Sequence, residues 1–538
     1  MRIVIPAAMC LALTLCGCSE APPGSGDQDG GSSRSIKWFE GDVADAFATA
    51  RNLGKPIFLY WGAEWCPPCH NLKENVFTRP EFLDAIGNFL PVELDGDTDR
   101  AQLWAERYGI SGYPTVILFS PTGIELFRMP SDVTPAQYGH LLQAAISEFR
   151  PVREVLSDVV DAGPEHASEL DLELLAYHSW LQDPNTAMTD AEALDMFWRI
   201  YSECPALSGR LQARFMVLTL ERAMQKIWSA GLNSDAGPKP VLDQNQVPAL
   251  RSGLVELLNS PTLWPDNKIF LTLQSRRAIQ ALEPEPGPGR DELVDAWLAV
   301  AEEIQVHPEY SATEQLMAFV PEFELLSLRD SGSDETVPAS LQNKVRARVE
   351  PVISGAAESG EFQSTLNMLV WLHTMAGLSD EAAALLDEHK NQTAAPHYFL
   401  SILGDLSAED PDTALEWHRL AFDQSGRGSS RVKWGTAYVQ KLIQLAPDDP
   451  VAIETATREV ISVLATSGDA FAGRNHAYLM QIDHALRGWA DATDNSPVID
   501  ELRQEFVRQC DRFKSEMDES QYERCMAFLA GDPPTNEP

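Results

Sequence analysis

The most informative segment of the sequence is Trp65-Cys66-Pro67-Pro68-Cys69-His70. An apolar run at residues 56–61 precedes it and predicts a buried strand, while residues 71–76 after it indicate a helix. A cysteine between a strand and a helix lies beside free backbone N–H groups and the positive end of the helix dipole, which favours thiolate over thiol. We therefore expect Cys66 to be a nucleophile, and Cys69, one helical turn on, to be the resolving cysteine that attacks a mixed disulfide at Cys66.

Two cysteines at this spacing also occur in zinc sites, so a zinc site is the alternative to a redox site. A zinc site normally has a second pair of Cys or His ligands, and His70 is the only histidine nearby. Pro67 and Pro68 favour a rigid helix start. The other histidines are scattered and form no metal motif such as HExxH. We therefore predict redox chemistry, with no metal site and no bound cofactor.

The segment 36–150 shows the element order of a small mixed sheet. We expect strands at residues 37–40 (a short edge strand), 57–61, 89–94, 116–119 and 124–128, and helices at 42–53, after the cysteine pair, at 78–86, 100–108 and 135–149. Asp42 is the expected N-cap of the first helix and Gly54 its C′ residue. The order β-α-β-α-β-α-β-β-α predicts an α/β fold with helices on both faces of the sheet.

Three separated landmarks in this segment resemble the thioredoxin-like family. Residues 65–69 match its active site, residues 107–115 match the segment that holds its cis-proline, and Gly123 matches the turn of its last hairpin. Residues 75–82 further look like the subgroup that includes the C-terminal domain of the transmembrane thiol:disulfide interchange proteins. The resemblance covers about 115 residues and implies a thioredoxin fold with thiol–disulfide oxidoreductase activity.

The resemblance also implies roles for particular residues. Pro114 is expected to be cis and to lie against the two sulfurs, where it would keep metals out. Trp65 and Tyr113 are expected to bind the substrate, with the backbone of Tyr113 free to pair with a substrate strand. The Cys66–Cys69 disulfide is expected to be the redox-active one.

Two positions depart from the family pattern. Tyr60 stands where the family has a buried aspartate, and Glu93 stands where it has the partner lysine. A desolvated carboxylate near Cys69 accepts the proton when that thiol ionises. Glu93, hydrogen-bonded to Tyr60, is one candidate for this role; the alternative is that Glu93 points to solvent. Glu64 is a third acid within reach.

The first 35 residues read as an export signal followed by a tether. Residues 1–18 hold one early cation and an apolar run too short to span a bilayer. Their end, Leu15-Cys16-Gly17-Cys18, resembles a bacterial lipoprotein signal, which implies lipidation at Cys18; ordinary signal cleavage and an uncleaved anchor stay open. Ser19 favours the outer over the inner membrane by the same resemblance. Residues 19–35 are rich in Gly, Ser, Pro and acid and predict a flexible tether spanning about 20–25 Å.

The composition limits the classes of partner. The formal net charge of −39 argues against nucleic acid and against an anionic lipid surface beyond the lipid anchor. Eight cysteines in 538 residues indicate a chain whose folding relies on apolar cores rather than on many disulfides.

The region 151–538 predicts an all-α structure of one or two subdomains. Apolar residues recur at helical spacing in segments such as 208–226, 291–305, 341–352 and 496–510, with breaks at 163–165, 234–240, 283–289 and 331–338. Between residues 360 and 460 two helix starts lie 32 residues apart at Ala382 and Ala414, and residues 446–450 resemble a junction between tetratricopeptide units. A degenerate helical repeat array with a concave face is one interpretation, and a plain helical bundle is the other.

The remaining cysteines are assigned from their positions. Cys510 and Cys525 lie in consecutive predicted helices, and a disulfide between them would contribute about 3 kcal/mol, with a pair of buried thiols as the alternative. Cys204 has no evident partner and is expected to be a buried free thiol.

These features together predict a lipid-anchored thiol–disulfide oxidoreductase on the periplasmic side of the cell envelope. We expect it to act as a reductase or isomerase on exported proteins with disulfides, to take electrons from a membrane thiol donor, and to hold its client or partner with the helical region. Two alternatives stay open: a scaffold or binding lipoprotein whose thioredoxin-like part is a docking surface, and a reductant dedicated to the maturation of haem proteins or metalloproteins.

Overall fold

The computed structural model describes residues 35–131, 133–184, 188–204, 207–232, 241–329, 336–359, 361–464 and 468–530. The predicted signal sequence, Cys18 and almost all of the predicted tether lie outside the described residues. From residue 36 onward the chain forms one compact unit. Among the described residues, no helix combines the length and the apolar character that crossing a membrane requires.

A four-stranded mixed sheet lies at the centre of the N-terminal part, in the order β2-β1-β3-β4. Strand β1 (Ile57–Gly62) pairs in parallel with β2 (Leu90–Asp95) and antiparallel with β3 (Thr115–Phe119), which pairs antiparallel with β4 (Glu125–Arg128). All six residues of β1 are buried, so the apolar run before the cysteine pair is the central strand of this sheet.

Helices cover both faces of the sheet. The first helices are α1 (Val43–Leu53), α2 (Pro67–Asn75), α3 (Pro80–Ile86), α4 (Asp99–Tyr108) and α5 (Pro135–Ser147). Leu59 and Trp61 of β1 share an apolar cluster with α1 and α4, whereas Phe58 and Tyr60 share one with α2, α3 and α5. The predicted α/β architecture is therefore confirmed, including the N-cap at Asp42, whose side chain accepts a hydrogen bond from the Ala44 N–H, and the left-handed Gly54 with φ of 63°.

The predicted edge strand at residues 37–40 is wrong. This segment has no strand geometry and makes a single backbone hydrogen bond to the sheet, from Phe39 N–H to Pro91 O at 2.8 Å. The Trp38 ring instead packs against Phe58, Tyr60 and Phe77. Trp38 packs on the core and α1 begins shortly afterwards, so residues 37–40 are too few to form a strand as well.

All regular elements among the described residues beyond 151 are helices, as predicted. They are α6 (Val152–Ala162), η1 (Pro164–His166), α7 (Glu169–Tyr177), η2 (Trp180–Gln182), α8 (Asp190–Glu203), α9 (Gly209–Leu232), α10 (Gln246–Leu258), η3 (Pro261–Leu263), α11 (Lys268–Leu273), α12 (Ser275–Leu282), α13 (Pro288–Ile304), α14 (Ala312–Met317), α15 (Val320–Glu324), α16 (Leu326–Arg329), α17 (Ala339–Arg346), α18 (Val349–Ser359), α19 (Phe362–Met375), α20 (Ser379–His389), η4 (Lys390–Gln392), α21 (Pro396–Leu406), α22 (Pro411–Gln424), α23 (Gly428–Leu445), α24 (Pro450–Leu464), η5 (Gly468–Phe471), α25 (Gly473–Thr493), α26 (Ser496–Phe513) and α27 (Glu519–Ala527).

Two of the differences from the predicted helix boundaries involve prolines near helix starts. The helix expected over residues 341–352 is divided into α17 and α18. Pro351 has no N–H to donate to the carbonyl four residues back, so a continuous helix through it would lose a hydrogen bond and clash with the preceding turn. Helix α26 begins at Ser496, with Asn495 rather than Ser496 as the flanking cap residue.

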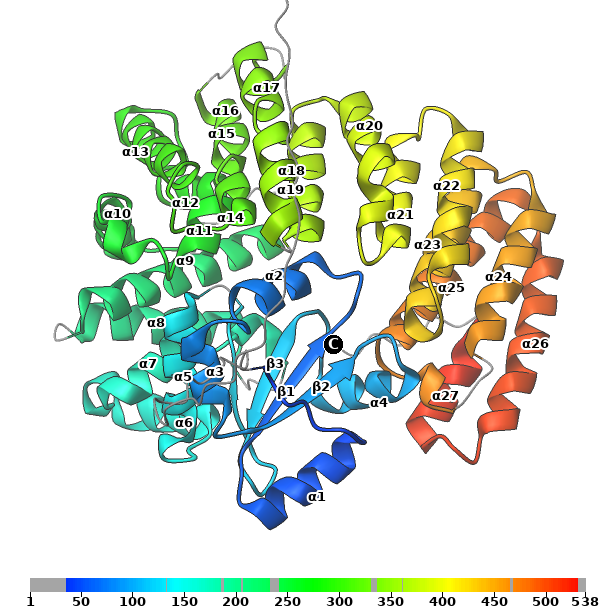
Figure 1. The fold of residues 1–538 in the computed structure, drawn as a ribbon, viewed down its shortest axis with the longest axis horizontal. Coiled ribbons are helices and arrows are strands. Elements are labelled where there is room, and N and C mark those ends of the chain that lie inside the picture. The colour runs from blue at the N-terminus through cyan, green and yellow to red at the C-terminus, as the bar shows by residue number, and fades with distance from the viewer. Residues whose placement is uncertain are drawn as a thin grey trace, which may run out of the picture. The chain divides into compact units, whose positions relative to one another are not determined.

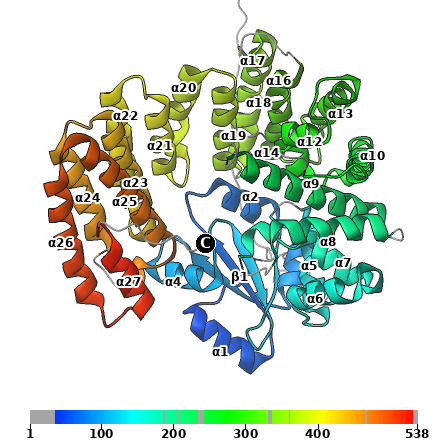
Figure 2. The same ribbon diagram turned by 180° about the vertical axis from the view of Figure 1, so that it is seen from behind.

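The helices run in an arc around the sheet domain, from α6 to α27 (Figure 1), and the view from behind shows the same course (Figure 2). Consecutive helices pack as neighbours, for example α8 with α9 and α21 with α22. Helix α19 packs against α2, and α23 and α25 pack against α4. The helical region therefore contacts the sheet domain on both sides of the cysteine pair.

Three further cysteines among the described residues are buried in the helical region. Cys510 and Cys525 are joined by a disulfide between α26 and α27. Cys204, at the end of α8, is a buried free thiol, and burial raises its pKa above the ordinary value.

Candidate functional site

The cysteine pair forms a disulfide at the start of α2. Cys66 is the N-cap residue of this helix, and its Sγ accepts a hydrogen bond from the Cys69 N–H at 3.2 Å. Pro67 occupies the first helical position, where its missing N–H costs no hydrogen bond. A negative charge on the Cys66 sulfur would thus lie at the positive end of the helix and beside a backbone donor.

The segment before β3 closes one side of the site. The Tyr113–Pro114 peptide bond is cis. The Tyr113 hydroxyl donates a hydrogen bond to the Gly96 carbonyl at 3.0 Å and accepts one from Gln102 at 3.2 Å. The Tyr113 ring lies 6.2 Å from the Trp65 ring, centroid to centroid. The structure therefore brings together the two residues predicted to bind the substrate.

An aspartate that the sequence analysis did not single out holds Trp65. The Trp65 Nε1 donates a hydrogen bond to Asp97 Oδ1 at 3.1 Å. Burial raises the pKa of Asp97 to about 6, against the opposing effects of this hydrogen bond and of the cations Lys433 and Arg474. Asp97 therefore titrates close to neutral pH beside the residue that precedes Cys66.

The predicted hydrogen bond between Tyr60 and Glu93 is not formed. The two residues are register partners on β1 and β2, but the Tyr60 hydroxyl has no hydrogen-bond partner among the described residues. Glu93 accepts a hydrogen bond from Lys73 at 2.5 Å, and its side chain is 33% exposed. Burial, and then the Glu93 charge, raises the pKa of Tyr60 well above its ordinary value. Glu93 is thus partly exposed and paired with Lys73 rather than with Tyr60.

Residues of the helical region pack against the residues that flank the cysteine pair. We call them the cover: Gln363, Ser364, Tyr398, Lys433, Trp434 and Arg474, from α19, α21, α23 and α25. Ser364 donates a hydrogen bond to the Pro67 carbonyl at 2.7 Å, and Gln363 donates one to the Glu64 carbonyl at 3.2 Å.

Aromatic packing completes the cover. The Tyr398 ring stacks on Trp65 at 6.4 Å with an angle of 14° between the planes, and Trp434 meets Trp65 edge-on at 6.2 Å. Cys66 is 3% exposed and Cys69 is 1% exposed. On the opposite side, Gln182 donates a hydrogen bond to the Pro114 carbonyl at 3.0 Å. A folded protein cannot reach the disulfide in this arrangement, so a reaction with one requires the cover to move.

The carboxyl groups of Glu74 and Glu361 repel each other where α2 packs on α19. Glu74 Oε2 is buried without a hydrogen-bond partner among the described residues. Burial, and then the nearby Glu361, raises the pKa of Glu74 to about 7, and burial raises the pKa of Glu361 as well. The ordinary pKa of a glutamate is 4.5, so between pH 4.5 and about 7 the folded chain keeps a proton that the unfolded chain releases. Stability therefore falls as the pH rises through this window.

Replacement of Glu74 by glutamine should remove this pH-dependent loss. We expect Glu74→Gln to raise the melting temperature at pH 8 by about 1–2 °C over the unmodified chain, and to give no gain at pH 4, as measured by calorimetry. Glu81→Gln, at an exposed position on α3, is the matched control and should show the same difference at both pH values. An equal effect of Glu74→Gln at pH 4 and pH 8 would contradict this account.

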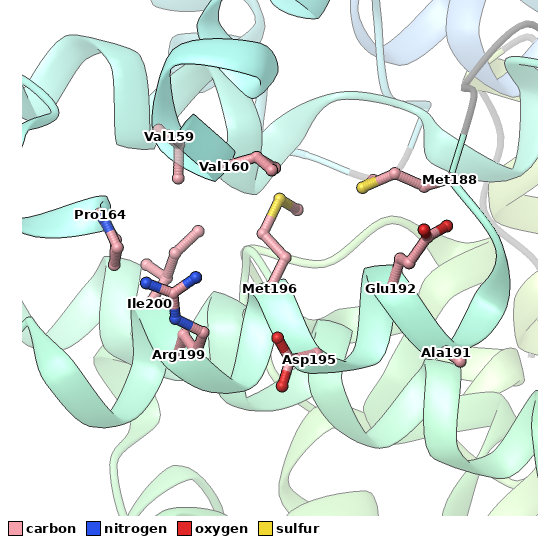
Figure 3. A pocket seen from close by; sticks show the side chains of 10 residues that line it. All are labelled: Val159, Val160, Pro164, Met188, Ala191, Glu192, Asp195, Met196, Arg199 and Ile200. Atoms are coloured by element: carbon pink, nitrogen blue, oxygen red, sulfur yellow. The ribbon is translucent and has the colours of Figure 1, made fainter. Parts of the chain in front are cut away.

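A separate cavity of about 540 Å³ lies between α6 and α8, away from the cysteine pair. Figure 3 shows Met188 and Met196 pointing into it, with Glu192, Asp195 and Arg199 along α8. Its lining contains no cysteine.

Comparison with known proteins agrees with this geometry. The thioredoxin-like domain family matches residues 43–146. The thiol:disulfide interchange protein DsbD 1 of Pseudomonas aeruginosa is 33% identical over 82 residues, which are 15% of this chain and 14% of that protein. Probable nucleoredoxin 3 of Oryza sativa subsp. japonica is 26% identical over 149 residues, with 22% of this chain and 31% of that protein covered.

Two solved structures are also similar to part of the chain. A DsbH oxidoreductase has 20% sequence identity and a TM-score of 0.20, with 23% of this chain and 96% of that chain covered. A thioredoxin from Thermus thermophilus has 25% identity and a TM-score of 0.19, with 20% and 85% covered. The chain spans only about one seventh of the first curated relatives it matches. Residues 43–146 form a thioredoxin-like domain that carries a disulfide of the CPPC type.

Proposed function

We propose that the chain is a thiol–disulfide oxidoreductase of the cell envelope that acts on disulfides of exported proteins. The observation that carries this proposal is the Cys66–Cys69 disulfide at the N-terminus of α2. The match to the thioredoxin-like domain family and the names of the interchange proteins similar to it support the same chemistry.

The reaction follows from the two sulfurs. In the reduced chain, the Cys66 thiolate attacks one sulfur of the client disulfide, forms a mixed disulfide and releases the other client sulfur as a thiolate. The Cys69 thiolate then attacks the Cys66 sulfur, which releases the client in its dithiol form and closes the Cys66–Cys69 disulfide. Two electrons pass to the client, and a membrane thiol donor returns two electrons to the disulfide. As an isomerase, the chain would release the client by attack of a second client thiol instead.

The predicted anchor and partners belong to the same proposal. Lipidation at Cys18, with the outer membrane favoured, would tie the catalyst to the periplasmic side of the envelope by residues 19–35. The helical region, whether or not it consists of tetratricopeptide-like repeats, would select or hold the client. Its cover residues would leave the cysteine pair when the client binds.

A second candidate is favoured by one observation, the burial of both sulfurs under the cover. In this alternative the chain is a scaffold or binding lipoprotein whose thioredoxin-like part is a docking surface, and the disulfide has no turnover. The two functions differ in whether Cys66 ever forms a bond with another protein.

A mixed-disulfide trap tests the proposal. The full-length Cys69→Ala variant, expressed in the source organism, should accumulate disulfide-linked complexes with exported proteins, because the mixed disulfide at Cys66 cannot be resolved. A reductant should separate these complexes. Gel electrophoresis under non-reducing conditions and mass spectrometry would identify the partners, and Cys66→Ser/Cys69→Ala is the matched control. Several clients support a general oxidoreductase, and one apoprotein supports a dedicated reductant. Absence of complexes specific to Cys66 would favour the scaffold.

A further inference from the structure

Two basic side chains of the helical region are buried against the aromatic residues that flank the cysteine pair. The Lys433 Nζ lies 3.3 Å from the centroid of the Trp65 ring and 4.3 Å from that of Trp434. The Arg474 guanidinium lies 4.5 Å from the centroid of the Tyr113 ring and 5.7 Å from that of Trp65. Trp65 precedes Cys66 in the chain and packs with both cysteines in one apolar cluster. The two cations therefore sit on the residues next to the redox sulfur.

The local charges do not balance while the disulfide is closed. Among the described residues, the Asp97 carboxylate attracts both Lys433 and Arg474. Burial, and then Lys433, lowers the pKa of the adjacent His397 to about 4, so this ring is neutral at pH 7. The tyrosines around the pair are neutral as well, since burial raises the pKa of Tyr113, Tyr398 and Tyr478. The Arg474 cation and the partly protonated Lys433 thus face Asp97.

Lys433 shows the effect of this imbalance. Burial, and then repulsion by Arg474, lowers its pKa to about 7, against the attraction of Asp97. The pKa of a buried cation rises when an anion is placed beside it. Reduction of the disulfide to a Cys66 thiolate supplies such an anion, and charges in a buried site are poorly screened by salt.

We propose that Lys433 and Arg474 are positioning residues that hold positive charge beside Cys66 and thereby stabilise its thiolate. This inference rests on the proposed redox function and extends it, because it makes the helical region a part of the redox site. In the step concerned, a dithiol donor loses two electrons and becomes a disulfide, while Cys66–Cys69 gains them and becomes a Cys66 thiolate and a Cys69 thiol. One of the donor's two protons goes to Cys69 and the other to solvent or to Lys433. Since the reduced form is stabilised, the covered pair is a stronger oxidant than the same pair without the cover.

The test titrates Cys66 in the full chain by the ultraviolet absorbance of its thiolate, which needs no reagent to enter the site. Cys69→Ala leaves Cys66 as the one free thiol of the pair, and the signal of Cys66→Ala/Cys69→Ala is subtracted to remove the contributions of Cys204 and the tyrosines. We expect a Cys66 pKa below the ordinary value of about 8.5. Lys433→Gln or Arg474→Gln should each raise it by about one unit, a tenfold change in the ionisation constant, and Lys433→Arg should keep it low.

A second lysine of the same helix provides the matched control. Lys441 lies on α23 and pairs with Asp405 at 2.8 Å, away from Trp65. Lys441→Gln should leave the Cys66 titration unchanged. An unchanged Cys66 pKa in both Lys433→Gln and Arg474→Gln overturns the inference. Far-ultraviolet circular dichroism identifies any variant that does not fold. If one of the two glutamine variants does not fold, the Cys66 pKa of the other decides the test.

The reduction potential gives an independent measurement. Equilibration with dithiothreitol, followed by acid quenching and mass spectrometry of the peptide that holds both cysteines, should show a tenfold fall in the reduction equilibrium constant in Lys433→Gln, or about 30 mV toward more negative potential. A shifted titration in a chain that captures no client would overturn the proposed function alone. Client capture with unshifted titration would overturn this inference alone.

Discussion

Replacement of Gly428 by alanine should expose Cys66 to large reactants and raise its reaction rate with them by about tenfold or more. Gly428 begins α23, with φ of 62°, and a Cβ built there would lie 2.1 Å from the Asp97 carbonyl oxygen. The next residue, Ser429, donates its N–H to that same oxygen at 2.9 Å. Because the contact is with backbone, α23 must withdraw from the thioredoxin-like domain to relieve it, and α23 carries Lys433 and Trp434.

The size of the effect follows from the equilibrium between covered and open forms. A clash together with a strained φ costs about 1–3 kcal/mol in the covered form. Each 1.4 kcal/mol changes the open population tenfold, and a large reactant meets Cys66 only in the open form. The rate would be measured with a maleimide that carries a polyethylene glycol chain, in a Cys69→Ala/Cys204→Ser background.

Gly426→Ala is the matched control for this variant. Gly426 lies two residues earlier with φ of 75°, but a Cβ there meets nothing within 4 Å. It therefore shares the backbone strain without the clash and should leave the rate of the large reactant within about threefold of the parent. Equal rates in Gly428→Ala and Gly426→Ala would show that contact of α23 with Asp97 does not control access.

The thioredoxin-like domain could be predicted because its signals are local. The apolar run of β1, the cap at Asp42 and the left-handed Gly54 each act on neighbouring residues, and the segment around Pro114 lies within one short motif. The edge strand at residues 37–40 failed for the opposite reason. Its backbone pattern was compatible with a strand, but the packing of Trp38 on Phe58 and Phe77 decided its course.

The cover could not be predicted from one sequence. Tyr398, Trp434 and Arg474 lie more than 300 residues beyond Trp65, and helical periodicity shows which face of a helix is apolar but not which surface it meets. Burial of Lys433 could not be anticipated either, because a lysine next to a tryptophan is ordinarily exposed. The close approach at Gly428 is visible only when the Asp97 carbonyl is placed beside it. The cysteines were thus found by their spacing, while their surroundings required the three-dimensional structure.

Replacement of Cys66 by serine should lower the reduction of a disulfide substrate such as insulin by about 10³-fold or more, to the uncatalysed rate. A serine hydroxyl is not ionised at neutral pH and cannot form a mixed disulfide, so the reaction loses its first bond-forming step. Cys204→Ser is the matched control, since that thiol is buried at the end of α8 and takes no part in the proposed mechanism. It should keep the parent rate, measured by insulin precipitation with dithiothreitol as the electron source.

The same substitution tells whether the cover regulates the redox pair or merely hides a disulfide without function. If Gly428→Ala accelerates insulin reduction through Cys66, then Gly428→Ala/Cys66→Ser should lose the whole gain, whereas Gly428→Ala/Cys204→Ser should keep it. A gain that survives without Cys66 would mean that the opened chain acts through another group, and the proposed mechanism would be wrong. If only Gly428→Ala/Cys66→Ser loses the gain, then the contact at Gly428 acts through the Cys66 sulfur. The helical region would then control access to the thiolate that Lys433 and Arg474 stabilise.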